Sequence, residues 1–197
     1  MKKYKLTKTT KEYLGTTLYQ IEAIMGFSNV KKGDLGGWIE KEENLSQVDN
    51  CWVFGNAQVY DDAQVSGDAR VFGNAQVYDD AQVSGDAQVY GNAQVSDNAQ
   101  VYGNAWVYGN AQVYDDAQVS DDAQVSGNAR VFGNLKLIGG YFYHYKEKSE
   151  EIEKVEVDED YELLCREPKL AEEASLAGKK VKIKVKDQII EGELIEE

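Results

Sequence analysis

The sequence predicts a fold dominated by β-strands, in which residues 51–140 form a parallel β-helix of hexapeptide repeats. Residues 53–70, VFGNAQVYDDAQVSGDAR, and residues 71–88, VFGNAQVYDDAQVSGDAQ, differ only at their last position. Inside this period of 18 lies a period of six, Ala-x-Val-x-(Gly/Asp)-(Asn/Asp). The hexads run without an inserted loop from CWVFGN at residues 51–56 to LKLIGG at residues 135–140. A fixed period of this kind is the sequence signature of a solenoid.

Each hexad has the pattern of one short strand followed by one corner. Residues i and i+2 of a strand lie on the same face, so we expect Val59 and its equivalents to point inward beside small alanines such as Ala57. The residues between and after them are mostly Gln, Arg, Tyr, Phe and Ser, and these should point outward. A Gly-Asn, Asp-Asp or Gly-Asp pair then forms the corner, because these residues tolerate left-handed backbone. Three strands and three corners make one coil, and five coils about 4.8 Å apart make a prism about 24 Å tall.

The segment before the repeats, residues 1–50, is predicted to be an N-terminal β cap. The ends of a β-helix expose unpaired strand edges, which need to be covered. This segment alternates in places and contains GDLGGWIEKEENLS at residues 33–46. We expect short strands and a glycine-rich turn here, with Trp38 and Ile39 plugging the first coil.

The segment after the repeats, residues 141–197, is predicted to be a small C-terminal α+β unit. Its pattern predicts two strands, near residues 152–157 and 161–165, and a short helix at residues 168–177 with proline in its first turn. The alternating sequence VKIKVKDQIIEGELIEE that follows predicts a β-hairpin.

Negative charge is concentrated outside the first segment. The chain has a net charge of −14, of which residues 51–140 contribute −8 (3 basic and 11 acidic side chains). Such a surface repels phosphate backbones, so direct binding of nucleic acid is disfavoured, whereas a basic protein partner would suit it. Charge of this size also keeps a protein soluble. There is no apolar run near the roughly 18 residues of a membrane span and no signal-peptide pattern, so we expect a cytoplasmic protein without a membrane partner.

Sorting the hexads by their place in the coil separates three faces, which differ in the outward residue after the valine. On the first face this residue is Phe54, Phe72, Tyr90, Tyr108 or Ser126. On the second face it is Tyr60, Tyr78, Ser96, Tyr114 or Phe132. On the third face it is Ser66, Ser84, Tyr102, Ser120 or Ile138.

Two of the faces thus carry rows of aromatic residues. Such rows can stack along the axis and stabilise the prism, together with aligned glutamines such as Gln58, Gln76, Gln94 and Gln112. Exposed aromatic rows are also typical of association surfaces. On this second interpretation the predicted protein-binding residues are Phe72, Tyr90, Tyr108, Trp106, Tyr60, Tyr78, Tyr114 and Phe132.

The edges between the faces differ as well. The edge after the first face is Gly-Asn throughout, whereas the edge after the second face is rich in aspartate. Carboxylates stacked about 4.8 Å apart repel one another, so water, a cation or a basic partner should offset them. Calcium prefers oxygen ligands, but two-residue corners are too short to wrap an ion, and no metal site is predicted. The acidic edge adds to the predicted protein-binding residues Asp61, Asp62, Asp79, Asp80, Asp115 and Asp116.

Catalytic motifs are not visible in the sequence. The one histidine, His144, lies beyond the last hexad and has no fixed acidic partner. Cys51 and Cys165 are too few for a disulfide framework and, with one histidine, for a zinc site. The chain contains neither a GxSxG nucleophile motif nor a GxxxxGK[ST] phosphate loop. No catalytic residue, cofactor or metal is therefore predicted.

The hexads at residues 51–140 resemble the hexapeptide-repeat, left-handed β-helix superfamily, whose best-known members are acyltransferases and γ-class carbonic anhydrases. The left hand is what the resemblance implies, since the usual crossover rule predicts a right hand. More narrowly, residues 33–46 followed by GNAQVYDDAQV are similar to bacterial and prophage proteins of the YdcK type, often described as transferases. Superfamily acyltransferases place a histidine in or beside the coils, and the carbonic anhydrases need three. The hexads contain none, so we expect that the protein is not an enzyme.

These observations predict a non-catalytic scaffold or protein-binding β-helix that self-associates through its aromatic faces. The resemblance implies a homo-oligomer, with a trimer favoured, because superfamily members commonly form trimers along the prism sides. One alternative is an acidic phage-encoded inhibitor that presents its aspartates to a basic host protein, such as a defence or nucleic-acid-binding protein. A hexapeptide acyltransferase and a protein that sequesters a small molecule between protomers are further alternatives.

Overall fold

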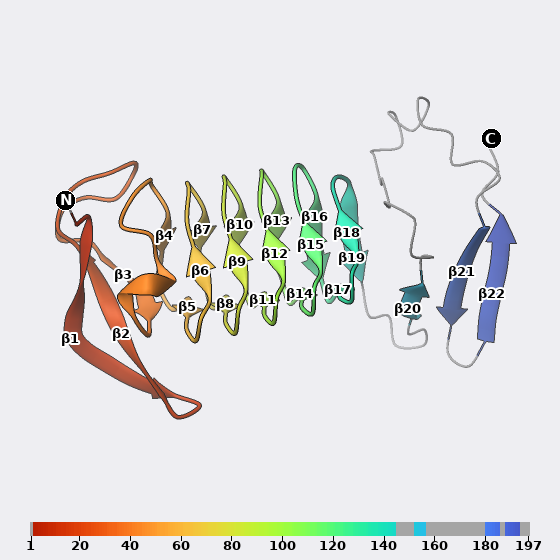
Figure 1. Cartoon of the computed structure of the whole chain (residues 1–197), viewed down its shortest axis with the longest axis horizontal. Helices are drawn as coiled ribbons and strands as arrows, with labels where there is room; N and C mark the ends of the chain where they lie inside the picture. Colours follow the sequence, from red (N-terminus) through yellow and green to blue (C-terminus); the bar gives the residue numbers. More distant parts are fainter. Residues whose placement is uncertain (1, 145–151, 157–179, 186–187, 194–197) are drawn as a thin grey trace.

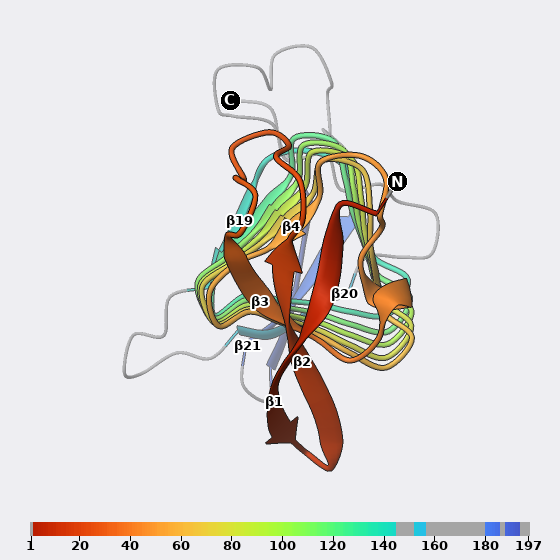
Figure 2. The ribbon, with the colours of Figure 1, turned by 90° about the vertical axis from the view of Figure 1, so that its left-hand side faces the viewer.

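The computed structural model describes residues 2–144, 152–156, 180–185 and 188–193 of the chain. It confirms the predicted parallel β-helix, whose coils follow one another along the long axis of the molecule (Figure 1). Viewed along this axis, the coils superimpose (Figure 2). Apart from one 3-10 turn, η1 (Glu42–Asn44), the regular elements of the described residues are all strands.

Three sheets form the three faces that the sequence separates. The first face consists of β4 (Trp52–Val53), β7 (Arg70–Val71), β10 (Gln88–Val89), β13 (Trp106–Val107), β16 (Gln124–Gly127) and β19 (Tyr141–His144). The second face consists of β3 (Leu35–Ile39), β5 (Gln58–Val59), β8 (Gln76–Val77), β11 (Gln94–Val95), β14 (Gln112–Val113) and β17 (Arg130–Val131), and the hairpin β1 (Tyr4–Tyr13) and β2 (Thr16–Ala23) extends it. The third face consists of β6 (Gln64–Val65), β9 (Gln82–Val83), β12 (Gln100–Val101), β15 (Gln118–Val119) and β18 (Lys136–Leu137).

Within the repeats, each strand pairs in parallel with the equivalent strand one full coil away. On the second face, for example, Val77 pairs with Val95, and the backbone N–H of Tyr78 donates to the carbonyl oxygen of Val95 at 3.0 Å. The alanine and valine of each hexad point inward as predicted, and from Ala57 to Val125 they are at most 1% exposed. Burial of this continuous apolar column is the main favourable contribution to the stability of the solenoid.

The β-helix begins before residue 51. Strand β3 pairs in parallel with β5, with Trp38 opposite Gln58 and Ile39 opposite Val59, and an isolated bridge joins Leu45 to Val65. Residues 35–50 therefore form an irregular first coil, in a wider register than the repeats, where the sequence predicted a glycine-rich turn that plugs the first coil. The first and second faces each hold six parallel strands, so the prediction of five coils is one coil short.

Two consecutive glycines allow this first coil to lie close to its neighbours. A Cβ atom on Gly36 would lie 2.5 Å from Cγ1 of Ile21 and 2.7 Å from Cζ2 of Trp52. A Cβ atom on Gly37 would lie 2.6 Å from Cγ1 of Val53. The GDLGGW segment is thus a packing feature of the capped end.

The hairpin of β1 and β2 covers the start of the β-helix (Figure 2). The ring of Tyr4 is fully buried and meets the ring of Trp52 edge-to-face at 6.0 Å between centroids. Its hydroxyl donates to the carbonyl oxygen of Leu45 at 2.7 Å. The ammonium group of Lys3 is also buried, and it donates to the carbonyl oxygen of Cys51 at 2.9 Å. These contacts tie the N-terminal hairpin to the first coil.

The β-helix continues past residue 140, because β19 pairs in parallel with β16 in a slightly narrower register than the repeats, with Gln124 opposite Tyr141. Further along the chain, β20 (Ile152–Glu156), β21 (Lys180–Val185) and β22 (Gln188–Glu193) form an antiparallel sheet, as predicted for the first strand and the hairpin of the C-terminal unit. The strand predicted at residues 161–165 and the helix predicted at residues 168–177 lie outside the described residues. None of the helices among the described residues could cross a bilayer.

Candidate binding surfaces

The first-face aromatic row is a continuous parallel stack of three side chains, Phe72, Tyr90 and Tyr108. The ring centroids of Phe72 and Tyr90 are 4.6 Å apart, those of Tyr90 and Tyr108 are 5.0 Å apart, and each pair is within 4° of parallel. All three residues are half-buried, and burial raises the pKa of Tyr90. Trp106, on β13 of the same face, is 37% exposed. This row therefore presents a stripe of aromatic surface to solvent.

The second-face aromatic row is interrupted. Tyr60 stacks on Tyr78 at 5.2 Å and Tyr114 stacks on Phe132 at 5.2 Å, but Ser96 occupies the position between these two pairs. The start of the row is also covered, since the ring of Tyr13 in the hairpin meets that of Tyr60 at 5.8 Å. Tyr60 is consequently only 5% exposed, and burial is the largest cause of the rise in its pKa.

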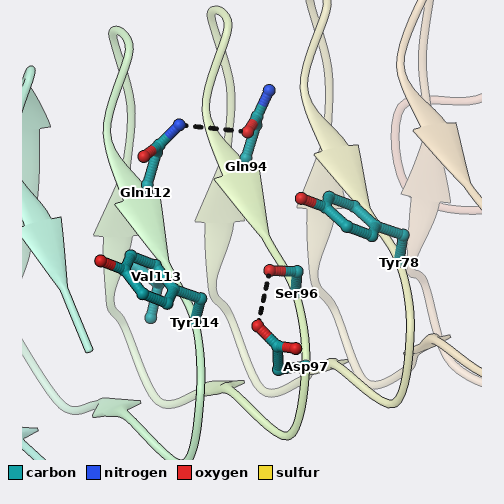
Figure 3. Close-up of a pocket in the computed structure, with 7 residues that line it drawn as sticks. All are labelled: Tyr78, Gln94, Ser96, Asp97, Gln112, Val113 and Tyr114. Carbon is teal, nitrogen blue, oxygen red and sulfur yellow. Dashed lines mark hydrogen bonds between the residues drawn. The ribbon is translucent and has the colours of Figure 1, made fainter. Parts of the chain in front are cut away.

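The interruption leaves a slot between Tyr78 and Tyr114, which Figure 3 shows with its lining side chains. Ser96 lies at its base and is 7% exposed. The cavity has a volume of about 250 Å³. On one side Gln112 donates to the side-chain oxygen of Gln94 at 3.2 Å, and on the other the hydroxyl of Ser96 donates to the carboxylate of Asp97 at 3.2 Å. Aromatic walls, a hydroxyl and a carboxylate thus meet in one depression.

The aspartate edge follows the second face and owes its order to backbone hydrogen bonds between coils. Asp61, Asp79, Asp97 and Asp115 all adopt left-handed backbone, with φ between 54° and 57°. The carboxylate of each accepts a hydrogen bond from the backbone N–H one coil further on, at 3.0 to 3.5 Å. These N–H groups supply part of the compensation that stacked carboxylates need.

The second aspartate of each corner points to solvent. Asp62, Asp80 and Asp116 are exposed. Lys41 forms an ion pair with Asp62 at 2.6 Å, and Asn98 donates to Asp116 at 3.0 Å. Asp80 therefore remains the most available of the three for a partner, with Asp62 already bound within the chain.

The Gly-Asn edge, which follows the first face, is neutral and internally bonded. Its asparagine side chains donate to one another from coil to coil at 3.1 to 3.3 Å, in a chain formed by Asn56, Asn74, Asn92, Asn110 and Asn128. Such amide rows stabilise stacked strands. The predicted row of glutamines is less regular, because Gln76 bonds to the hydroxyl of Tyr13 at 3.1 Å instead of to its neighbours.

The sequence-based site list therefore falls into two separate surfaces. The first-face aromatic row adjoins the neutral edge, and the second-face aromatic row adjoins the aspartate edge. Ser96 and Asp97 were missed as site residues, although the single serine in an otherwise aromatic row is visible in the sequence. Across the described part of the chain, no cluster of three or more His, Cys, Asp or Glu side chains could hold a metal ion.

Comparison with known proteins supports the repeat assignment. The YdcK β-solenoid repeat matches the chain over residues 63–79, 75–91, 81–97, 87–103, 93–109, 99–115 and 123–135. The chain is also 38% identical over 80 residues to the uncharacterized acetyltransferase YdcK of Escherichia coli (strain K12). The aligned part covers 36% of this chain and 24% of that relative, so the chain spans about a quarter of the relative's length. The predicted resemblance to YdcK-type hexapeptide-repeat proteins is confirmed.

The expectation that the protein is not an enzyme is contradicted by this similarity, because the relative's name describes it as an acetyltransferase. The expectation depended on the absence of histidine from the hexads. That criterion was too narrow, since Glu, Asp, Lys, Tyr and Cys side chains can also act as general acids or bases.

Proposed function

Because the coils of this chain match the YdcK β-solenoid repeat, we propose that they form a binding surface through which the chain associates with copies of itself. The observation that carries the proposal is the first-face aromatic row, in which Phe72, Tyr90 and Tyr108 stack without interruption and stay partly exposed. With Trp106 on the same face, this row has the aromatic composition of protein interfaces.

Charge favours the first face over the second. The protein has a net charge of −14, so two copies repel one another wherever their carboxylates approach. The first-face aromatic row lies directly before the Gly-Asn edge, whose corner residues carry no charge from Gly55 to Asn128. The second-face aromatic row lies directly before the aspartate edge, and its first ring, Tyr60, is already covered by Tyr13. A self-complementary contact therefore costs least electrostatically on the first face.

The proposed assembly is a homo-oligomer in which first faces lie at the subunit contacts. A trimer is the favoured state, because three prisms can each bury one side around a common axis. Since the acidic edges repel, added salt should strengthen the association by screening them.

Analytical ultracentrifugation of the full chain tests this proposal. We expect a species with three times the chain mass of 22.0 kDa. Trp106→Gln and Tyr90→Ser should weaken association about tenfold or more, the effect of losing roughly 1.4 kcal/mol at the contact. Trp106→Gln is a conservative change, because Gln88 and Gln124 occupy the paired positions of the adjacent coils.

A matched control is Tyr102→Ser on the third face, whose row already contains Ser84 and Ser120. This variant should associate like the unmodified chain, with all variants checked by circular dichroism for intact fold. A monomer up to the highest soluble concentration, or equal association of all variants, would overturn the proposal.

An acetyltransferase activity is a second candidate, favoured by the 38% identity to the acetyltransferase-named relative. The aligned segment is long enough to span most of the coils, so a catalytic contribution would come from the solenoid or from a contact between its copies. Incubation with acetyl-CoA, and measurement of free CoA thiol with and without amine acceptors, tests it directly. This candidate is rejected if acetyl-CoA leaves the melting temperature unchanged and no thiol is released above background.

A further inference from the structure

We propose that the slot between Tyr78 and Tyr114 binds a planar cation, either a guanidinium group or a cationic nitrogen heterocycle. The slot lies on the second face, apart from the surface proposed for self-association. Its walls are two tyrosine rings, its base is Ser96, and its acidic side is Asp97. Figure 3 shows the two rings on either side of Ser96.

The spacing of the rings fits one flat group. Neighbouring coils are about 4.8 Å apart, so Tyr78 and Tyr114, which are two coils apart, are separated by about 9.6 Å along the axis. A flat group midway between them would lie about 4.8 Å from each ring. The aromatic pairs of the two rows have centroid distances of 4.6 to 5.2 Å, so an inserted group would reproduce the spacing already present.

The walls of the slot are held in place before any ligand arrives. The outer face of Tyr78 is supported by Tyr60, and that of Tyr114 by Phe132, each in a stack within 8° of parallel. Tyr60 is in turn held by Tyr13 of the hairpin. Rigid aromatic walls reduce the entropy lost on binding.

Electrostatics select a cation. Electron-rich ring faces attract cations, and guanidinium groups stack on aromatic faces more readily than ammonium groups do. Within the described chain, the hydrogen bonds to the Asp97 carboxylate from Ser96 and Asp115 both use Oδ2, which leaves Oδ1 available to accept from a ligand N–H. Asp79 and Asp115 add negative charge on the adjacent coils. An anionic group, such as a phosphate or carboxylate, would be repelled here.

The volume of the slot limits the size of the ligand. Sites for drug-sized molecules measure about 300–1,000 Å³, whereas this cavity measures about 250 Å³. It therefore suits the flat end of a larger molecule, or a single small ring system, and the rest of the molecule would lie over the aspartate edge.

The test uses the full chain and two matched pairs of probes, measured by saturation-transfer NMR and calorimetry at low salt. The first pair is 1-methylnicotinamide, a planar cation, and nicotinamide, its neutral counterpart. The second pair is the amide of Nα-acetylarginine and the amide of Nα-acetyllysine, which carry a planar and a tetrahedral cation. We expect the planar cation of at least one pair to bind at least about fivefold more tightly than its partner, a ratio equivalent to about 1 kcal/mol.

Three variants locate the site. Ser96→Tyr completes the aromatic row and should abolish binding. Ser84→Tyr, the control, adds a tyrosine next to Tyr102 on the third face and should leave binding unchanged. Asp97→Asn tolerates the left-handed backbone at this corner and should remove the preference for the cation over its neutral counterpart.

The pattern of binding distinguishes the natural source of the ligand. Binding of the arginine probe alone indicates an arginine side chain of a protein, and binding of 1-methylnicotinamide alone indicates a heterocyclic small molecule. Binding of both supports a site for planar cations in general. The proposal is overturned if neither planar cation binds at millimolar concentrations, if binding survives Ser96→Tyr, or if nicotinamide binds as tightly as its cation.

Discussion

The carboxylate of Asp79 accepts a hydrogen bond from the backbone N–H of Asp97, the residue one coil further along the same edge, at 3.4 Å. Asp79 also holds left-handed backbone, with φ of 55°. One side chain thus satisfies a donor of the next coil and tolerates a backbone conformation that most residues avoid. This dual role explains why aspartate recurs on an edge where its charges repel.

Replacement of Asp79 separates the two roles. Asp79→Ala loses the acceptor and places a less tolerant residue in left-handed backbone, so the free energy of unfolding should fall by about 1–2 kcal/mol. Asp79→Asn keeps an acceptor oxygen and tolerates the same backbone, so it should stay within about 0.5 kcal/mol of the unmodified chain. Urea denaturation followed by circular dichroism measures both. Equal losses for the two variants would show that neither role matters.

The glycine pair of the first coil should not accept a methyl group. Gly36→Ala would bring Cβ to 2.5 Å from the Ile21 side chain and 2.7 Å from the carbonyl oxygen of Val53. We expect a loss of about 3 kcal/mol, at the upper end of the cost of overpacking, because one contact is with backbone. Gly26→Ala is the control, since its Cβ would meet only the carbonyl oxygen of Val30 at 3.6 Å. Thermal melts of the two variants should differ clearly, and similar melts would contradict the close packing.

Asn44 should be essential for attaching the first coil to the second. Its buried side-chain amide donates to the carbonyl oxygens of Asp61 and Ala63, both at 2.9 Å, and its oxygen accepts from the N–H of Lys41 at 2.9 Å. Asn44→Ala leaves these backbone groups without a partner and should cost about 2–3 kcal/mol. Asn56→Ala, at the exposed Gly-Asn edge, should cost less than about 1 kcal/mol. Hydrogen exchange should report the loss locally, in residues 40–46, and unchanged protection there would refute the role of Asn44.

Alkaline pH should destabilise the protein through its buried tyrosines. Burial, followed by the neighbouring carboxylate of Glu42, raises the pKa of Tyr4, and burial is likewise the first cause of the raised pKa of Tyr60. The unfolded chain ionises these phenols near pH 10, whereas the folded chain keeps them protonated, so stability is fully present below pH 10 and falls as the pH rises above it. Each group should contribute a slope of up to about 1.4 kcal/mol per pH unit.

Urea titrations monitored by circular dichroism between pH 8 and pH 11.5 test this dependence. Tyr4→Phe removes one of the two groups, so its stability should fall less steeply above pH 10, although its stability at pH 8 is lower because two backbone carbonyls lose their donor. An identical slope for the variant and the unmodified chain would exclude Tyr4 as a source of the effect.

The repeat could be predicted almost completely from the sequence, because each of its interactions is local to one hexad or recurs once per coil. Inward alanine and valine, outward polar and aromatic residues, and corner pairs all follow from the period of six. The same rule, applied more loosely, would have found the first coil. Gly37-Trp38-Ile39 has the small-x-aliphatic pattern of Ala57-Gln58-Val59, with which it pairs, but its wider register hides it from a search at the period of the repeats.

Contacts between distant segments could not be predicted in this way. Nothing in the local pattern indicates that Tyr13 lies on Tyr60, because this contact depends on the path of the hairpin. The bonds from carboxylates to the next coil were also unforeseen, although the repulsion that they offset was expected. The gap at Ser96 was legible in the sequence, but its meaning required the knowledge that rings on both sides face it.

The spacing between paired residues narrows along the chain, since Trp38 pairs with Gln58, Gln58 with Gln76, and Gln124 with Tyr141, and this change has an evolutionary consequence. Irregular coils at the two ends seal the solenoid, whereas the interior coils are nearly interchangeable. Unequal recombination between near-identical gene segments that each encode one coil would therefore lengthen or shorten the rod in whole coils and leave both end structures intact. Molecular length in this lineage can be inherited as a quantised trait, varied in steps of about 4.8 Å.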